Sequence, residues 1–260
     1  MTPVPDQDIP RKVAASQGGR WVVEGFRLYR KNPLLLSAAF GLMFAILIAL
    51  NLIPGIGAAF SELATPLMVA GFMVAYRALD SDRELELPHF LVGVSNPAPP
   101  GPTLPLMTLG AVQMLATLLI SQVMLGMGFD SAAVMKAAQN PKTSPAEMQA
   151  VMNQALPAAL TGLALFTPLI MATWFAPALV LFGGARPATA LGVSFKAVAR
   201  NWPAMFVNGL ALGLVLFVAA LVPLLLGLLV AMPVLFGSLY ASYQAVFAVW
   251  SDEASADGAV

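Results

Sequence analysis

The chain has 260 residues, of which 59% are hydrophobic and 10% charged, and its 13 basic and 13 acidic side chains cancel. A typical soluble domain carries roughly 25% charged residues, so this chain has too few charges to cover a water-soluble surface. The zero net charge indicates no nucleic-acid partner. The absence of cysteine and the single histidine, His89, exclude disulfides, cysteine nucleophiles and multi-histidine metal sites.

The apolar residues come in long blocks without charges. Residues 33–76 contain one charge, Glu62, and residues 201–251 contain none. Uncharged stretches of about 18 residues or more are typical of transmembrane helices. The sequence therefore predicts an all-α, polytopic membrane helix bundle with about six spans, at residues 34–53, 60–79, 104–126, 157–182, 203–222 and 226–249.

The polar ends of the chain are predicted to lie outside the membrane. Residues 1–19 contain three prolines and lack the apolar segment of a signal peptide. We expect a flexible cytoplasmic tail over residues 1–19, a single transmembrane domain over 20–250, and a second cytoplasmic tail over 251–260.

The distribution of Lys and Arg predicts the orientation of the spans. If the N-terminus is cytoplasmic, the opposite side holds only Lys136 and Lys142. The cytoplasmic segments then hold eleven cations, namely Arg11, Lys12, Arg20, Arg27, Arg30, Lys31, Arg77, Arg83, Arg186, Lys196 and Arg200. Cytoplasmic loops of bacterial membrane proteins carry an excess of Lys and Arg. We therefore expect both termini in the cytoplasm of a bacterial inner-membrane protein.

Two stretches outside the spans are long enough to have structure of their own. Residues 80–103 form a cytoplasmic connector that ends in a proline-rich, non-helical run at 96–102. Residues 130–156 form the long outer loop. There, Ser144 before Pro145 is typical of a helix N-terminus, and we expect a short helix at 145–155. A helix on the membrane surface is favoured there over a ligand site.

The chain contains an internal repeat. Residues 26–33 resemble residues 195–203, because both begin with Phe and a cation and end with a cation, Asn and Pro. Each copy precedes a pair of spans, so spans one-two and five-six form two parallel-repeat hairpins.

The segment that leads into each hairpin is amphipathic, which is typical of an interfacial helix. The expected anchors are Arg20, Trp21, Arg27, Arg30, Lys31, Lys196 and Arg200. Anchoring is favoured over specific binding of anionic lipid, which stays open.

Three stretches carry a family resemblance: Phe26–Leu35, Pro66–Asp80 and Phe175–Met205, the last reading FAPALVLFGGARPATALGVSFKAVARNWPAM. They resemble a family of uncharacterised proteobacterial multi-pass inner-membrane proteins. The resemblance covers most of the chain except the tails and the outer loop. It implies the same membrane topology, and it carries over no catalytic or binding residue.

The predicted spans hold almost none of the acids, bases and nucleophiles that enzymes use. We predict no catalytic residue, no metal site and no cofactor. Candidates for a polar cavity or a helix interface are Glu62, Gln113, Gln122, Asn208 and Gln244. Gly209 and Gly213 form a GxxxG that would allow close helix contact. Four prolines inside the spans, Pro66, Pro168, Pro177 and Pro233, are expected to kink them.

Two functional hypotheses remain. The favoured one is a non-enzymatic integral membrane protein with a structural or interaction role, whose partners are membrane lipids and other membrane proteins. The alternative is a transporter or lipid-handling protein that uses a cavity between the duplicated hairpins. A continuous polar cavity would favour the second hypothesis, and an interior filled by side chains would favour the first.

Overall fold

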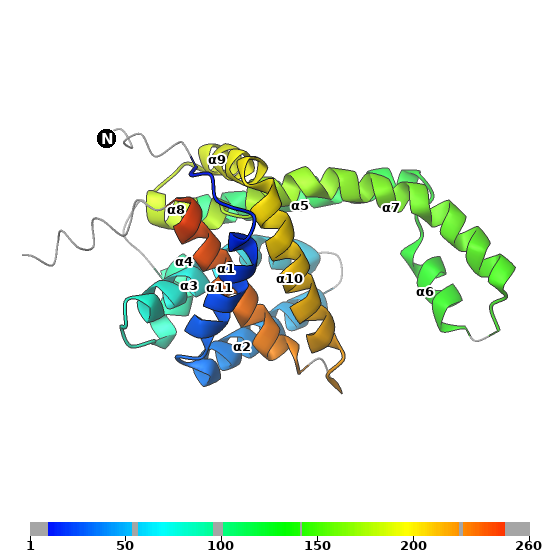
Figure 1. Ribbon diagram of the computed structural model, residues 1–260. Helices are drawn as coiled ribbons and strands as arrows, with labels where there is room; N and C mark the ends of the chain where they lie inside the picture. The colour runs from blue at the N-terminus through cyan, green and yellow to red at the C-terminus, as the bar shows by residue number, and fades with distance from the viewer. Residues whose placement is uncertain (1–9, 54–56, 96–100, 141, 224–225, 248–260) are drawn as a thin grey trace, which may run out of the picture. The chain divides into compact units, whose positions relative to one another are not determined.

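The computed structural model describes residues 10–53, 57–95, 101–140, 142–223 and 226–247, and their regular elements are helices (Figure 1). In chain order the helices are α1 (Gln17–Tyr29), α2 (Pro33–Asn51), α3 (Gly57–Asp80), η1 (Leu87–Leu91), α4 (Val92–Ser95), α5 (Thr103–Gly126), α6 (Ser131–Gln139), α7 (Pro145–Thr173), α8 (Ala176–Gly183), α9 (Pro187–Arg200), α10 (Trp202–Ala220) and α11 (Leu228–Val246).

Six helical segments of the described chain are long and apolar enough to cross a membrane, which confirms the predicted number of spans. They are α2, α3, α5, the segment of α7 and α8, α10 and α11. Residues 54–56, most of the predicted proline-rich run at 96–102, part of the turn between α10 and α11, and the last residues of the sixth predicted span lie outside the described residues.

The fourth span differs from the predicted helix at 157–182. Helix α7 already begins at Pro145, continues through Pro157 and Pro168, and ends at Thr173, before the separate helix α8. The expected short helix at 145–155 is therefore the first part of α7. The break falls just before Pro177, because in a continuous helix the proline ring would clash with the carbonyl four residues earlier and would offer that carbonyl no N–H group.

A serine from α9 satisfies the backbone at this break. The Phe175 N–H donates to Oγ of Ser194 at 3.0 Å, and the same hydroxyl donates to the Met171 carbonyl at 2.8 Å. Ser194 is fully buried. Buried backbone groups without partners are costly, so this side chain stabilises the break between α7 and α8.

The two segments outside the spans contain short helices that the sequence did not predict. In the connector, η1 packs on α3, and the Phe90 ring lies edge-on to Phe72 at 5.2 Å. In the outer loop, Asp130 caps α6 through bonds to two backbone N–H groups. The predicted cap at Ser144 is confirmed, because its hydroxyl accepts the Glu147 N–H at 3.2 Å.

The chain forms two compact units, Met1–Gly110 with Met171–Val260, and Ala111–Ile170, where the sequence predicts one domain. The second unit pairs parts of α5 and α7. Its Gly162 allows close packing, since a Cβ there would lie 2.5 Å from the Met124 sulfur.

In the larger unit, aromatic rings fill the space between α3 and α11. Phe72 stacks on Phe236 at 4.5 Å, and the fully buried Tyr76 donates its hydroxyl to the Pro233 carbonyl at 2.6 Å. Helix α11 also contacts α2 and α10.

Helix α1 packs against α10 and α11 (Figure 1). Its Gly25 faces Gly237 of α11. A Cβ atom added to Gly237 would lie only 2.8 Å from the Gly25 Cα atom. Trp21 is only 3% exposed, which corrects its prediction as an anchor at the edge of an interfacial helix. The apolar stripe of α1 therefore faces α10 and α11, because the glycines of α1 let its backbone come close to the backbones of these helices.

The described residues just before α1, 10–16, also bond to the larger unit, although the sequence predicts a flexible tail up to residue 19. The Arg11 N–H donates to the Val246 carbonyl at 2.9 Å, and the Val13 N–H donates to Oδ1 of Asn201 at 2.8 Å.

Proline in α11 leaves a carbonyl that another helix satisfies. Pro233 has no N–H, so the Leu229 carbonyl loses its donor four residues on. Ser37 of α2 donates to that carbonyl at 2.8 Å, and its hydroxyl also lies 2.9 Å from that of Tyr29. Together these bonds join α1, α2 and α11.

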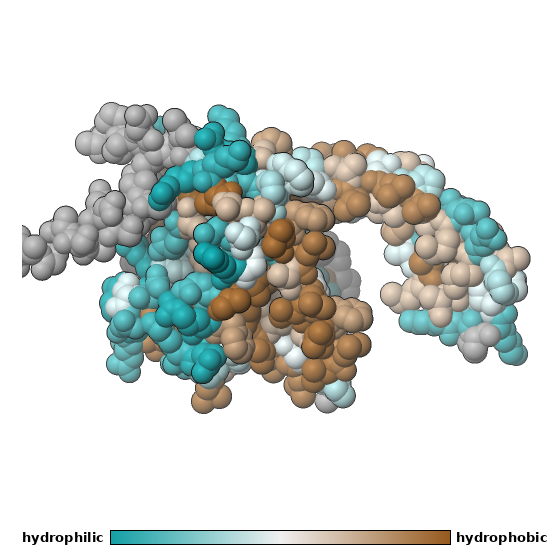
Figure 2. Space-filling model, viewed as in Figure 1, coloured by the Kyte–Doolittle hydropathy of each residue, from teal (hydrophilic) through white to brown (hydrophobic). Residues whose placement is uncertain are grey.

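Apolar side chains gather over α10 and hydrophilic ones beside α1 (Figure 2). On α10, Leu210, Leu214 and Phe217 are 60–65% exposed. Gly209 and Gly213 also face open space, with no atom near either Cβ position, so the expected close helix contact is absent from the described part of the chain. A contiguous apolar surface of this kind suits lipid contact.

Candidate functional site

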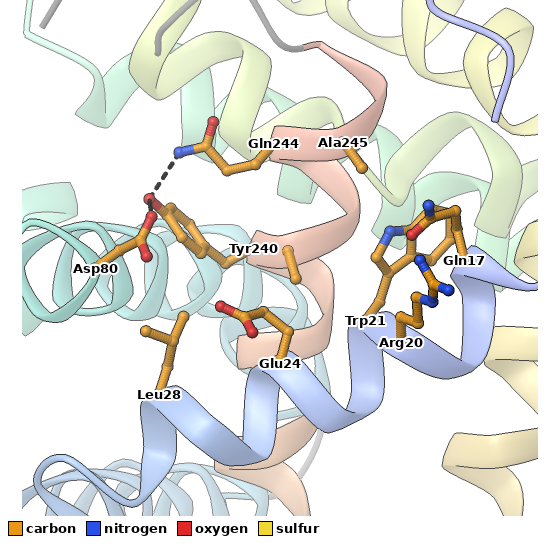
Figure 3. A pocket seen from close by; sticks show the side chains of 10 residues that line it. Gln17, Arg20, Trp21, Glu24, Leu28, Asp80, Tyr240, Gln244 and Ala245 are labelled. Atoms are coloured by element: carbon orange, nitrogen blue, oxygen red, sulfur yellow. Dashed lines mark hydrogen bonds between the residues drawn. The ribbon is translucent and has the colours of Figure 1, made fainter. Parts of the chain in front are cut away.

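A polar pocket of about 270 Å³ lies beside α1 (Figure 3). Three elements of the larger unit form it. Helix α1 contributes Gln17, Arg20, Trp21, Glu24 and Leu28; the end of α3 contributes Asp80; and the last turns of α11 contribute Tyr240, Ala241, Gln244 and Ala245. The end of a candidate span thus meets the amphipathic helix that precedes the first span.

Hydrogen bonds connect the α3 and α11 walls of this pocket. Nε2 of Gln244 donates to the Tyr240 hydroxyl at 2.7 Å, and that hydroxyl donates to Asp80 at 3.0 Å (Figure 3). The chain of bonds fixes both side chains of α11. It also gives the carboxylate of Asp80 a protein partner at the end of α3.

Cations of α1 compensate the acidic groups near the pocket. The Arg27 guanidinium donates to both oxygens of Glu24, at 3.0 and 2.9 Å, and lies 3.7 Å from Asp80. The hydrogen bond from Arg27 lowers the pKa of Glu24, although partial burial opposes the shift. Lys31, at the α1–α2 junction, donates to Asp82 at 2.5 Å and lowers its pKa in the same way.

The opposite wall of the pocket is rich in donors. The Trp21 indole lies beside Gln17 and Arg20 (Figure 3), and its buried N–H has no hydrogen-bond partner among the described residues. An unpaired buried N–H costs roughly 1–3 kcal/mol. The pocket therefore offers a cation and neutral donors on one side and paired carboxylates on the other.

The structure distributes the five predicted polar candidates over separate places. Gln244 lines the pocket, and Asn208 is buried, where it accepts the Ser238 hydroxyl at 2.7 Å. Glu62 lies 18 residues before Asp80 on α3, or roughly 27 Å along the helix. Gln113 and Gln122 belong to the other unit. The candidates therefore form no common site in the larger unit.

Sequence reasoning missed most of the pocket. Asp80 was assigned to the connector, and Tyr240 was not singled out. The signal that existed was the Glu24–Arg27 spacing on one face of α1, which places the two side chains together on a helix. The contacts of α1 with α3 and α11 were not visible in the sequence.

Comparison with known proteins identifies the relatives of the chain. A protein of Burkholderia thailandensis described as a "Probable inner membrane protein" is 32% identical over 257 residues, covering 92% of this chain and 93% of that protein. The chain belongs to this family of inner-membrane proteins. No family model matches the chain, and no solved structure matches it.

Membership of this family agrees with the six apolar helices. The protein is a multi-pass protein of the inner membrane. The exposed leucines and phenylalanines of α10 would then face lipid rather than water. The description of the relative assigns no chemistry to the pocket beside α1.

Proposed function

We propose that this inner-membrane protein is not an enzyme and acts through contacts with membrane lipids and other membrane proteins. The observation that carries this proposal is the filled interior between the α2–α3 and α10–α11 hairpins. Phe72 and Phe236 stack there, and the backbones of α1 and α11 touch at Gly25 and Gly237. Such packing between the two hairpins supports a structural or interaction role over the transport of a solute between them.

The proposal includes the orientation of the chain, with residues 81 and 260 in the cytoplasm and residue 131 outside. The excess of Lys and Arg in one set of loops supports it.

The packed interior and the orientation can be tested in one experiment. The chain has no cysteine, so a single introduced cysteine reports on one position at a time. Ser238 is fully buried, whereas Ser81 and Ser131 are exposed. In intact cells, we expect a membrane-impermeant maleimide to label Ser131→Cys only. In permeabilised cells it should also label Ser81→Cys, but not Ser238→Cys, because water does not reach the packed interior.

The controls separate the two parts of the proposal. Denatured protein must label at all three positions, which shows that each cysteine can react. Labelling of Ser81→Cys in intact cells would reverse the orientation. Labelling of folded Ser238→Cys would show a water-filled path and favour a transporter.

The pocket beside α1 supports the second candidate, a lipid-handling protein. It lies between the ends of α3 and α11, one helix from each hairpin. A proteoliposome assay of lipid transfer between leaflets tests this candidate: acceleration by the reconstituted protein would favour it over a purely structural role.

A further inference from the structure

Another cavity, formed by described residues of the larger unit, has a volume of about 620 Å³ and a different chemistry from the pocket beside α1. Its walls come from α3, α4, the start of α5, α8 and the turn between α8 and α9. The lining residues are Val74, Arg77, Val92, Gly101, Pro102, Pro105, Val180, Leu181, Phe182, Gly184, Ala185, Arg186 and Pro187. A volume of this size suits a small molecule, since ligand pockets span roughly 300–1,000 Å³.

The charges of this cavity are all positive. Among its lining residues, Arg77 and Arg186 are the charged ones, and no carboxylate is present. Three lining residues are prolines, which have no N–H to offer a ligand. The guanidinium groups are therefore the strong donors of the wall. Planar guanidinium groups bind phosphate with two parallel hydrogen bonds.

The rest of the cavity wall is apolar. Val74, Val180 and Leu181 contribute aliphatic side chains from two candidate spans. The Arg77 guanidinium lies 5.2 Å from the centre of the Phe182 ring, and this cation–π contact keeps the charge beside the apolar wall. A ligand that matches both surfaces has an anionic head and an apolar tail.

We propose that this cavity binds the phosphate head of an anionic phospholipid, with an acyl chain against the apolar wall. Arg77 lies near the end of α3, where a lipid head group can reach it, and Arg186 immediately precedes α9. Basic pockets between membrane helices on the cytoplasmic side bind anionic head groups. This inference rests on the proposed function, in which the protein contacts membrane lipids, and it names the cavity as the site of one such contact.

The test uses the full chain in nanodiscs that contain equal parts phosphatidylglycerol and phosphatidylcholine. Native mass spectrometry then measures which lipid stays bound to the released protein. We expect phosphatidylglycerol to exceed phosphatidylcholine by about tenfold, because both lipids carry a phosphate but the two guanidinium groups repel the quaternary ammonium group of phosphatidylcholine. Arg186→Gln should remove most of this preference. Arg83→Gln should not, because the exposed Arg83 is not among the lining residues.

Several outcomes would overturn the inference. One is equal retention of the two lipids by the wild-type chain, and another is an equal loss in the Arg83→Gln control. Displacement of the lipid by excess inorganic phosphate would assign the arginines to a soluble anion instead. Arg77→Gln provides a second variant if Arg186→Gln fails to fold. Failure here leaves the maleimide labelling of Ser238→Cys unaffected, so the proposed function is judged separately.

Discussion

The two helices that lead into the hairpins, α1 and α9, have similar sequences and different surroundings. Both are amphipathic, and each is followed by a cation, Asn and Pro motif: α9 ends at the cation Arg200, whereas α1 ends at Tyr29, two residues before Lys31. Helix α1 buries Gly18, Trp21, Val22, Gly25, Leu28 and Tyr29 and packs on α10 and α11. Helix α9 buries Ala190, Ser194, Ala197 and Val198 and packs mainly on α8.

The difference follows from the small residues on the buried stripe. Gly18 and Gly25 are two helical turns apart, and a Cβ at either position would collide with the backbone of a neighbouring helix. Gly192 of α9 has no atom near its Cβ position. An amphipathic helix therefore enters a bundle when its apolar face also permits a close backbone approach.

The two asparagines at matching positions of the predicted repeat, Asn32 and Asn201, also have different roles. Asn32 caps α2 by accepting the Leu35 N–H at 3.2 Å. The buried Asn201 instead accepts from Val13 and donates to the Arg11 carbonyl at 2.9 Å. The same residue type thus starts a helix in one copy and holds the N-terminal segment in the other.

The largest expected effect comes from filling the glycine contact of α1. Gly25→Ala should lower the free energy of unfolding by about 3 kcal/mol, the upper part of the range for overpacking. The new Cβ would lie 2.5 Å from the Ser238 nitrogen, which is backbone and cannot rotate away. Thermal unfolding in detergent measures the change.

Gly192→Ala in α9 is the matched control, because both substitutions replace a glycine inside a helix. It should stabilise the protein by about 0.5–1 kcal/mol, since alanine favours the helix and no clash opposes it. Equal effects of the two substitutions would show that α1 and α9 are packed alike, contrary to the structure.

A smaller effect is expected from the asparagines. Asn201→Ala removes the hydrogen bonds to the Val13 N–H and the Arg11 carbonyl and should cost about 2 kcal/mol, at roughly 1 kcal/mol for each bond. Release of the N-terminal segment should also speed tryptic cleavage after Arg11 and Lys12. Limited proteolysis followed by mass spectrometry measures the rate.

Asn32→Ala serves as the comparison at the other copy. Loss of a helix cap costs about 1 kcal/mol, and cleavage at Arg11 should keep its wild-type rate. Equal rates of tryptic cleavage after Arg11 in the two variants would show that the hydrogen bonds of Asn201 do not hold the N-terminal segment in place.

The sequence predicted the number of spans well because hydrophobic length is a local property. It could not predict which proline breaks the fourth span. Pro157 and Pro168 lie inside α7, whereas the chain breaks before Pro177. The deciding feature is Ser194, which satisfies the freed backbone from a helix that comes later in the chain.

The candidate site was harder to predict, for a related reason. Glu24, Asp80 and Tyr240 come from three helices, and only the packing of α1 brings them together. Amphipathicity alone does not distinguish an apolar face that meets lipid from one that meets other helices. The predicted repeat made the choice harder, since it suggested similar positions for the two lead-in segments.

The smallest expected effect concerns the ion pair of α1. The Arg27 hydrogen bond keeps the pKa of Glu24 below its ordinary value of 4.5. A carboxyl group with a lowered pKa in the folded state stabilises the fold above its unfolded pKa, and this contribution is lost as the pH falls through the folded value. Because the Glu24 side chain is 39% exposed, solvent screening limits the contribution to less than about 1 kcal/mol.

Glu24→Gln should therefore reduce the loss of stability on acidification below about pH 4.5 and leave the neutral-pH stability slightly lower. Unfolding midpoints measured across this range test the expectation. Lys196→Gln in α9 is the control, because Lys196 corresponds in the repeat to Arg27 and has no ion pair among the described residues. A pH profile of stability that changes in Lys196→Gln but not in Glu24→Gln would mean that the acid sensitivity arises near α9. In that case the ion pair between Glu24 and Arg27 would add nothing to the stability of α1.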